Sequence, residues 1–550
     1  MASDTLDYLE YTKIKIADAA ITYSLSQIEE SFARFMKWKS AALLSLGTPE
    51  PPLSINDLDT TLGQLDLIIS SKPSILLGKE SKFAFLLSQA VRPLSGEWIW
   101  YKQELTEMTP KWAAQRNFVE EALPLLLVVS IKYFTKILET KEDSRISLFT
   151  ALCCYLYKGY PWSDSIPANI TKALNACAVQ VFDETPGYFD ILFIDVIKPT
   201  FSSAATHKEI SAAGRKVFTA NDEQPRLSHA FSKGFMDDPS FQKDPWKESR
   251  VYVISLLEVY LRHTIAVKST TQTQWSFFVP CVLNIIDYHN PAYKCKGADL
   301  LVLLIDSVSE DFFKKTGVAT VFWEALKPSL TFLPPSTPIS IAVPLSKSTF
   351  EAMIKLSYLN LASKRKTSDD KKTNIKPISI DLQEEYLLEG IFRGVSHTNK
   401  SPEMVTVFIN SANILVLNHL KTYTTPHLKP LIGIVVGTLC DPFISYAPEL
   451  MSASAKLLQT LIRAVWFRIP YYRYDILRGV IMASRRIIEE KNDGLIGPSE
   501  DLRESVKMLE ESVRVCMKQK LDSELGLSTF QKEIEILESK EPSFKELMKT

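Results

Sequence analysis

The stretch WSFFVPCVLNIIDYHNPAYKCKGADLLVLLIDSV, residues 275–308, decides the fold class of this chain. Apolar residues recur in it at steps of three and four, which places them on one face of a helix. Before the central DYHNP they are Trp275, Phe278, Val282 and Ile285, and after it they are Ala298, Leu301, Ile305 and Val308. Proline cannot continue a helix and pushes the residue before it out of α geometry, so Asn290-Pro291 ends the first helix. The stretch therefore predicts a helical hairpin.

The turn of this hairpin, DYHNPAYKCKG at 287–297, also brings together residue types that bind metals. Zinc sites usually show C-x2–4-C or H-x3–5-H spacing, and Asp287, His289 and Cys295 match neither. A turn accounts for more of the stretch, because Asp287 can bond backbone N–H groups and Gly297 lets two helices approach closely. We interpret the stretch as a turn and expect no metal site there.

The same helical spacing returns toward the C-terminus. One stripe begins at Met451 and another at Leu477, and a third follows Ser499, a residue type that often caps helix N-termini. Their apolar positions are Met451, Ala455, Leu458, Ile462 and Val465; Leu477, Val480, Ser484 and Ile488; and Leu502, Val506, Leu509, Val513 and Met517. Hairpins that are too small to bury their own faces are the units of α-solenoids. We predict an all-α fold, a HEAT-like α-solenoid of irregular helical hairpins.

Composition agrees with a helical fold and excludes some classes of protein. Glycine accounts for 18 of 550 residues, about 3%, against about 7% in average proteins. Doubly wound sheets and barrels consume glycine in phosphate loops and tight turns, so they are disfavoured. The net charge of -1 gives no global attraction to nucleic acid or acidic membranes.

Two segments interrupt the helical pattern. Residues 201–248 lack a sustained apolar stripe, so we divide the chain into an N-terminal helical region (1–200), an irregular linker or long loop (201–248) and a C-terminal HEAT-like helical-repeat region (249–550). The second segment, SKRKTSDDKKTNIKP at 363–377, is either a solvated loop or a nuclear-import patch.

Cysteine usage and apolar runs bear on location. The seven cysteines are scattered without a CxxC pair, which indicates reduced, buried thiols of an intracellular protein. The first residues, MASDTLDYLEYTK, lack the pattern of a secretory signal. Runs such as ALPLLLVV are shorter than the ~18–20 residues a spanning helix needs, so we expect no membrane partner.

Motifs of known catalytic sites are absent from the sequence. It contains no H-E-x-x-H, G-x-S-x-G or G-x-G-x-x-G, and PSILLGKES at 73–81 departs from a Walker A loop at Pro73 and Glu80. We therefore expect no enzyme activity, no catalytic residues, no cofactor and no metal. The open alternative is an enzyme whose dispersed histidines and acids converge in the fold.

One tract interleaves basic and aromatic side chains. It comprises Arg463, Trp466, Arg468, Tyr471, Tyr472 and Arg473. Such residues stack on nucleic acid, form protein hot spots, or pack within a turn with arginine stems on aromatic faces. We take Trp466, Arg468, Tyr471, Tyr472 and Arg473 as the candidate partner-binding residues and regard nucleic acid as the least favoured partner.

Several motifs, taken in order, resemble those of the Tel-two-interacting protein Tti-two family. They are DVIKPTF (195–201), DPWK (244–247), IIDYHNPAYKCKGADLL (285–301), FFKKTGVATVFWEALKPSLTFLPP (312–335) and RIPYYRYDILRG (468–479). The resemblance implies an α-solenoid scaffold without catalytic residues, the smallest of the three subunits of the TTT (Triple-T) co-chaperone complex.

The resemblance also implies partners and a location. The expected partners are the two other TTT subunits, most directly the largest HEAT-repeat subunit. Indirect partners are phosphatidylinositol-kinase-related kinases, such as the TOR and DNA-damage kinases, and the ninety-kilodalton heat-shock chaperone machinery. The expected location is cytoplasmic and nuclear. The alternative function is a HEAT-type transport or cargo adaptor.

Overall fold

A computed structural model of the chain describes most of its helices. The described residues are 25–42, 61–66, 69, 80–93, 110–136, 142–185, 187–202, 204, 207, 210–211, 213–216, 245–247, 249–265, 268–359, 378–398, 400–490, 496–518 and 529–549. Within them the regular structure is helical, and the one β feature is an isolated bridge between Ile210 and Lys216. The predicted all-α fold is confirmed.

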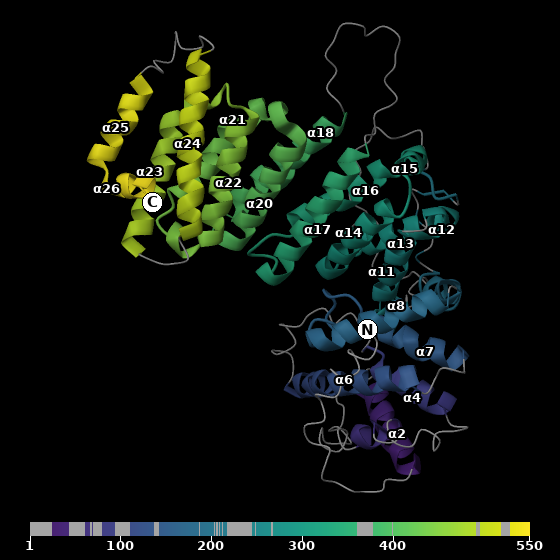
Figure 1. Ribbon diagram of the computed structural model, residues 1–550. Helices are drawn as coiled ribbons and strands as arrows, with labels where there is room; N and C mark the ends of the chain where they lie inside the picture. The colour runs from purple at the N-terminus through teal and green to yellow at the C-terminus, as the bar shows by residue number, and fades with distance from the viewer. Residues whose placement is uncertain are drawn as a thin grey trace, which may run out of the picture. The chain divides into compact units, whose positions relative to one another are not determined.

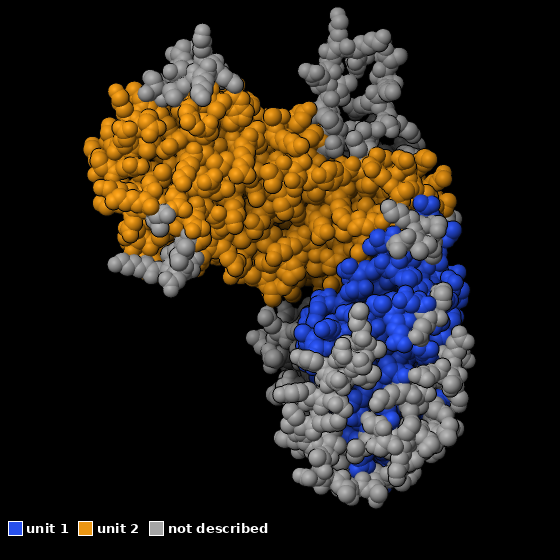
Figure 2. Space-filling view, in the orientation of Figure 1, with its two compact units in different colours: residues 1–206, 218–281 blue, residues 207–217, 282–550 orange. Residues whose placement is uncertain are grey.

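The chain forms two compact units, which Figure 2 colours separately. Unit 1 comprises residues 1–206 and 218–281, and unit 2 comprises residues 207–217 and 282–550. The predicted division around 201–248 stays a prediction, because residues 217–244 lie outside the described residues. The basic segment 363–377 lies outside them too.

Unit 1 is built from helices that pack on near neighbours in the sequence. They are α2 (Leu25–Ala42), α4 (Glu80–Val91), α6 (Pro110–Lys136), α7 (Glu142–Cys153), α8 (Ala168–Glu184), α9 (Tyr188–Ile191), the π-helical η5 (Leu192–Ile197), α10 (Lys198–Thr200), α11 (Val253–Thr264) and α12 (Lys268–Thr273). α4 packs on α2, α6 and α7, and α11 packs on α7 and η5. Most residues of α11 are buried.

Unit 2 stacks its helices in rows (Figure 1). One row runs α14 (Pro291–Asp306), α17 (Ile339–Tyr358), α20 (Pro402–Ile414), α22 (Pro448–Ala464) and α24 (Ile496–Lys518), each packed on the next. A second row runs α21 (Leu428–Leu439), α23 (Arg473–Glu490) and α26 (Pro542–Lys549). α21 packs on α22 and α23 packs on α24, which joins the rows. This is the packing of an α-solenoid.

Shorter helices complete unit 2 and make the array irregular. They are α15 (Glu310–Thr316), α16 (Ala319–Leu326), α18 (Ile378–Glu385), α19 (Arg393–Thr398), α25 (Phe530–Lys540), the π-helical η8 (Tyr386–Phe392) and η9 (Leu415–Leu420), and the 3-10 turns η7 (Lys327–Thr331), η10 (Lys421–His427), η11 (Ile444–Tyr446) and η12 (Ile469–Tyr472).

The hairpin at 275–308 forms as predicted, from α13 (Trp275–Asp287) and α14. All eight apolar positions of its two stripes are buried. One detail of the prediction is wrong: the turn is capped by Asn290, whose side chain accepts the N–H of Ala292 at 2.9 Å. Asp287 instead lies 3.2 Å from the His207 ring. Asn290 directly precedes the helix, where a cap must sit, whereas Asp287 lies in the last turn of α13.

The start of α24 also differs from the expectation. The helix begins at Ile496, so Ser499 lies within the first turn and does not cap it. Pro498 fits this position because the first N–H groups of a helix have no intrahelical acceptor. The apolar stripe that follows, from Leu502 to Val513, is buried as predicted.

Candidate partner-binding surface

The basic and aromatic tract forms the turn between α22 and α23. α22 ends at Ala464, the 3-10 turn η12 follows at Ile469–Tyr472, and α23 begins at Arg473. Ile469 and Pro470 are buried and anchor the turn. The sequence therefore brings the five candidate residues together at one end of this helix pair.

Arg473 serves the turn itself. Its side chain is buried, and its guanidinium donates to the Pro470 carbonyl at 3.0 Å and to the Tyr474 hydroxyl at 2.9 Å. The Tyr474 hydroxyl in turn donates to the Glu533 carboxylate, with oxygens at 3.1 and 3.2 Å. The packing interpretation of the tract thus holds at Arg473, whose side chain is committed to the fold.

The other four candidates differ in how far they reach solvent. Arg468 and Tyr471 are exposed, Tyr471 by 50%. The Arg468 guanidinium lies 5.8 Å from the centroid of the Tyr471 ring. Trp466 and Tyr472 are half-buried. The Trp466 carbonyl accepts the Ser512 hydroxyl at 2.9 Å, which ties the turn to α24. Arg468 and Tyr471 are therefore the members most open to a partner.

A second aromatic turn, residues 441–448, was not identified from the sequence. Phe443 and Tyr446 are each 72% exposed, whereas Ile444 and Ser445 between them are buried. The Asp441 carboxylate accepts the Phe443 N–H at 2.8 Å, which fixes the turn. A hydrogen bond to Glu490 raises the pKa of Tyr446. The available signal was an Asp-Pro pair followed by two aromatics, because Asp and Pro favour turns.

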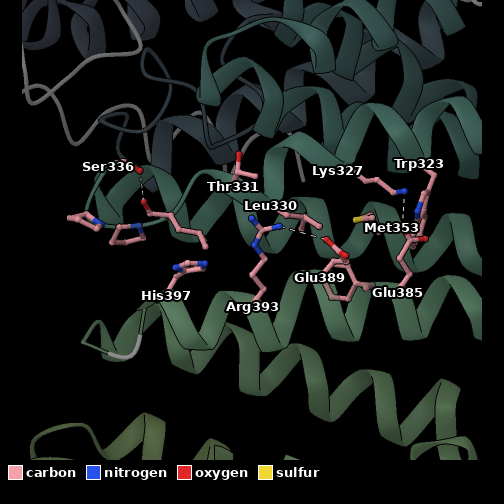
Figure 3. Close-up of a pocket in the computed structure, with 14 residues that line it drawn as sticks. Trp323, Lys327, Leu330, Thr331, Ser336, Met353, Glu385, Glu389, Arg393 and His397 are labelled. Carbon is pink, nitrogen blue, oxygen red and sulfur yellow. Dashed lines mark hydrogen bonds and ion pairs between the residues drawn. The ribbon is translucent and has the colours of Figure 1, made fainter. Parts of the chain in front are cut away.

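Unit 2 also contains a groove of about 450 Å³ (Figure 3). Its lining comes from α16, η7, the 333–336 loop, α17, and the continuous helix formed by α18, η8 and α19. The lining residues are Trp323, Lys327, Leu330, Thr331, Leu333, Pro334, Pro335, Ser336, Met353, Glu385, Tyr386, Glu389, Arg393 and His397. No linear motif predicts this groove, because the side chains converge from separate helices.

Charged side chains of the groove are paired unequally. Lys327 Nζ lies 2.6 Å from Glu385 and 2.9 Å from Glu324. Burial lowers the pKa of Lys327, but the hydrogen bonds to the two glutamates outweigh that effect and raise it. Arg393 lies 3.7 Å from Glu389, and both side chains are more than 60% exposed.

The described residues contain neither a candidate metal site nor a candidate membrane-spanning helix. Among them, no three His, Cys, Asp or Glu side chains are grouped so that they could hold a metal ion. No described helix combines the length and apolar character needed to cross a membrane. The cysteines at 153, 154, 177, 281 and 516 are buried and form no disulfide bond, as their apolar flanks predict, whereas Cys295 and Cys440 are half-buried.

Comparison with known proteins identifies the family. The model of the Tti2 family matches residues 148–446, whereas no solved structure matches the chain. The matched residues include the 275–308 hairpin and the groove, and they end within the 441–448 turn, before the 466–473 tract. The match covers more than half of the sequence and agrees with the stacked helices of unit 2. The chain therefore belongs to the Tti2 family, which is a family of non-catalytic scaffold subunits of the TTT co-chaperone complex.

Proposed function

We propose that this chain is a scaffold that binds the largest, HEAT-repeat subunit of the TTT complex most directly and stabilises the trimer. The family match over 148–446 carries the proposal. The stacked rows of unit 2 support it, because solenoids expose long continuous surfaces that hold large partners. A protein that binds only the folded form of its partner stabilises that form by mass action.

The cellular role of the proposed trimer is chaperone-dependent folding, stability and assembly of phosphatidylinositol-kinase-related kinases. These are the TOR and DNA-damage kinases, which the complex presents to the ninety-kilodalton heat-shock chaperone machinery. The proposed location is the cytoplasm and the nucleus, where these kinases act. In this role the chain contributes binding and carries out no reaction.

Two exposed aromatic turns are the contact sites we propose on this chain. Trp, Tyr and Arg side chains dominate interface hot spots, and aromatic rings bury much area at low entropic cost. Arg468 and Tyr471 provide one such pair, and Phe443 and Tyr446 provide the other. Arg473 is excluded from this surface because the turn requires it.

Co-expression of the chain with the two other TTT subunits tests the proposal. The wild-type chain is expected to form an equimolar trimer in size-exclusion chromatography. The R468A/Y471A and F443A/Y446A double variants are expected to remain folded. A variant whose altered turn contacts a partner is expected to bind that partner at least about tenfold more weakly. The control is K347A/E351A, which changes exposed side chains of α17.

The circular dichroism spectrum of each variant shows whether the fold is kept. Loss of assembly in K347A/E351A as well would mean that the effect of the substitutions is not specific to the aromatic turns. Full assembly in both aromatic variants would remove these turns from the interface. Absence of a trimer with the wild-type chain would contradict the proposed function itself.

A further inference from the structure

We propose that the groove at 323–397 binds a short, extended acidic segment of a partner protein. In this arrangement an apolar side chain of the segment lies on the groove floor, and a carboxylate of the segment meets Arg393 and His397. The groove shares no residue with the 441–448 and 466–473 turns. The inference therefore goes beyond the proposed trimer and does not rest on it.

The floor of the groove is apolar. Met353, Trp323 and Tyr386 are almost fully buried and form its base, and Leu330 and Leu333 line the wall contributed by η7 and the loop after it. An apolar side chain that leaves water for such a floor gains about 25 cal/mol per Å² of buried area. The floor thus favours Leu, Met or Phe in the bound segment.

The charges of the groove are complementary to an anion at only one of its ends. At the Trp323 end, Lys327 is neutralised by Glu385 at 2.6 Å and Glu324 at 2.9 Å. A cation already held by two carboxylates attracts little further negative charge. The Trp323 end is therefore suited to apolar contact.

At the other end, Arg393 and His397 point from α19 toward the opposite wall (Figure 3). The contact of Arg393 with Glu389 is 3.7 Å long and exposed, and such contacts are weak. Within the described residues the His397 side chain has no hydrogen bond or ion pair. A guanidinium binds a carboxylate through two parallel hydrogen bonds, which is stronger than this contact.

The length of the groove favours a peptide over a small dicarboxylate. Glu385 and His397 line it from one continuous helix, twelve residues apart. At about 1.5 Å per residue this span is roughly 18 Å. An extended chain covers that distance with about five residues, at about 3.3 Å each. One segment can thus reach from the apolar end to the basic end.

Fluorescence anisotropy with the full chain tests the inference. The probes are fluorescein-labelled nine-residue peptides with one leucine and one glutamate two, three or four residues apart, and matched peptides with glutamine in place of glutamate. We expect at least one glutamate peptide to bind, its affinity to fall with added salt, and its glutamine counterpart to bind at least about tenfold more weakly.

Variants locate the binding. R393Q is expected to weaken binding of the glutamate peptide by at least about tenfold. E389Q removes the carboxylate beside Arg393 and is expected to tighten binding of this peptide about two- to fivefold. The control is R478Q, because Arg478 is also an exposed arginine with a weak carboxylate contact, to Asp475 at 3.8 Å. The control variant is expected to bind like the wild type.

Three results would overturn the inference. They are no binding by any glutamate peptide, equal binding of the glutamate and glutamine peptides, and equal effects of R393Q and R478Q. Competition by free glutarate at the same concentration as the peptide would assign the groove to small dicarboxylates and reject the peptide. None of these results bears on trimer assembly, so the two proposals fail separately.

Discussion

At the scale of single residues, Gly297 sets the distance between α13 and α14. A Cβ at this position would lie 2.7 Å from Ile286 Cγ1 and 2.9 Å from the Ile286 backbone nitrogen. Nearby, Lys294 Nζ donates to the Ile286 carbonyl at 2.8 Å, which satisfies an acceptor in the last turn of α13. Burial lowers the pKa of Lys294, although nearby Asp287 acts against this.

Gly297→Ala is expected to destabilise unit 2 by about 3 kcal/mol, because the added methyl group meets both backbone and side chain of Ile286. The matched control is Gly433→Ala in α21, where an added Cβ has nothing within 4 Å. The control is expected to stabilise the chain by up to about 1 kcal/mol, since alanine favours helices. Urea unfolding measures both, and equal midpoints for the two variants would refute the close approach.

His263 makes the stability of unit 1 depend on pH. Its ring stacks on Phe189 with centroids 3.4 Å apart, and burial lowers the pKa of His263 below 6.5. Below pH 6.5 the unfolded chain therefore binds a proton that the folded chain resists, so stability falls as the pH drops. The melting temperature is expected to fall as the pH is lowered from 7.5 to 5.5. It is expected to fall less in the His263→Gln variant than in the wild type. Parallel curves for the two proteins would contradict this.

At the scale of elements, the helices were predictable where an apolar stripe is long, as at 275–308. Such a stripe needs only helical spacing in the sequence. Helix ends were less predictable. Ser499 has the chemistry of a cap, but α24 begins at Ile496. The π-helical η8 and the groove beside it were not predictable, because their geometry depends on packing between segments far apart in sequence.

The candidate site was predicted in part. Packing within a turn was one of three interpretations of the 466–473 tract, and the structure contains that turn. Composition could not tell that Arg473 points inward while Arg468 and Tyr471 are exposed. That distinction comes from the Pro470 carbonyl and the Tyr474 hydroxyl, which only the folded chain brings to the guanidinium.

An ion pair joins α23 to the start of α26, its neighbour in the second row of unit 2. Arg485 of α23 donates to Glu541, which directly precedes α26, at 2.9 and 2.5 Å. These bonds and one from Ser543 lower the pKa of Glu541 to about 2. A lowered carboxyl pKa adds stability above pH 4.5, and this stability is lost as the pH falls toward 2.

Glu541→Gln is expected to loosen α26 at neutral pH by up to about 1 kcal/mol, because the Arg485 side chain is about half exposed and water screens its charge. Hydrogen exchange of α26 amides measures the effect, and wild type and variant are expected to converge as the pH approaches 2. The control is Asp475→Asn, which removes the weak contact with Arg478. Unchanged exchange in Glu541→Gln would show that the pair does not hold α26.

At the scale of the whole molecule, unit 2 consists of two joined rows of helices whose long surface is suited to binding. The Tti2 family match covers unit 2 as far as residue 446 and extends into unit 1. The two proposed aromatic contact turns and the proposed peptide groove would give such a surface more than one place to hold a partner. We propose that this chain works as part of a stable assembly.

Purification of the tagged protein from its native cells, followed by quantitative mass spectrometry, tests that claim most directly. We expect two large helical-repeat proteins in near-equal amounts with the chain, with traces of large kinases and of the heat-shock chaperone. Elution of the chain alone, or with transport receptors in place of those partners, would contradict it.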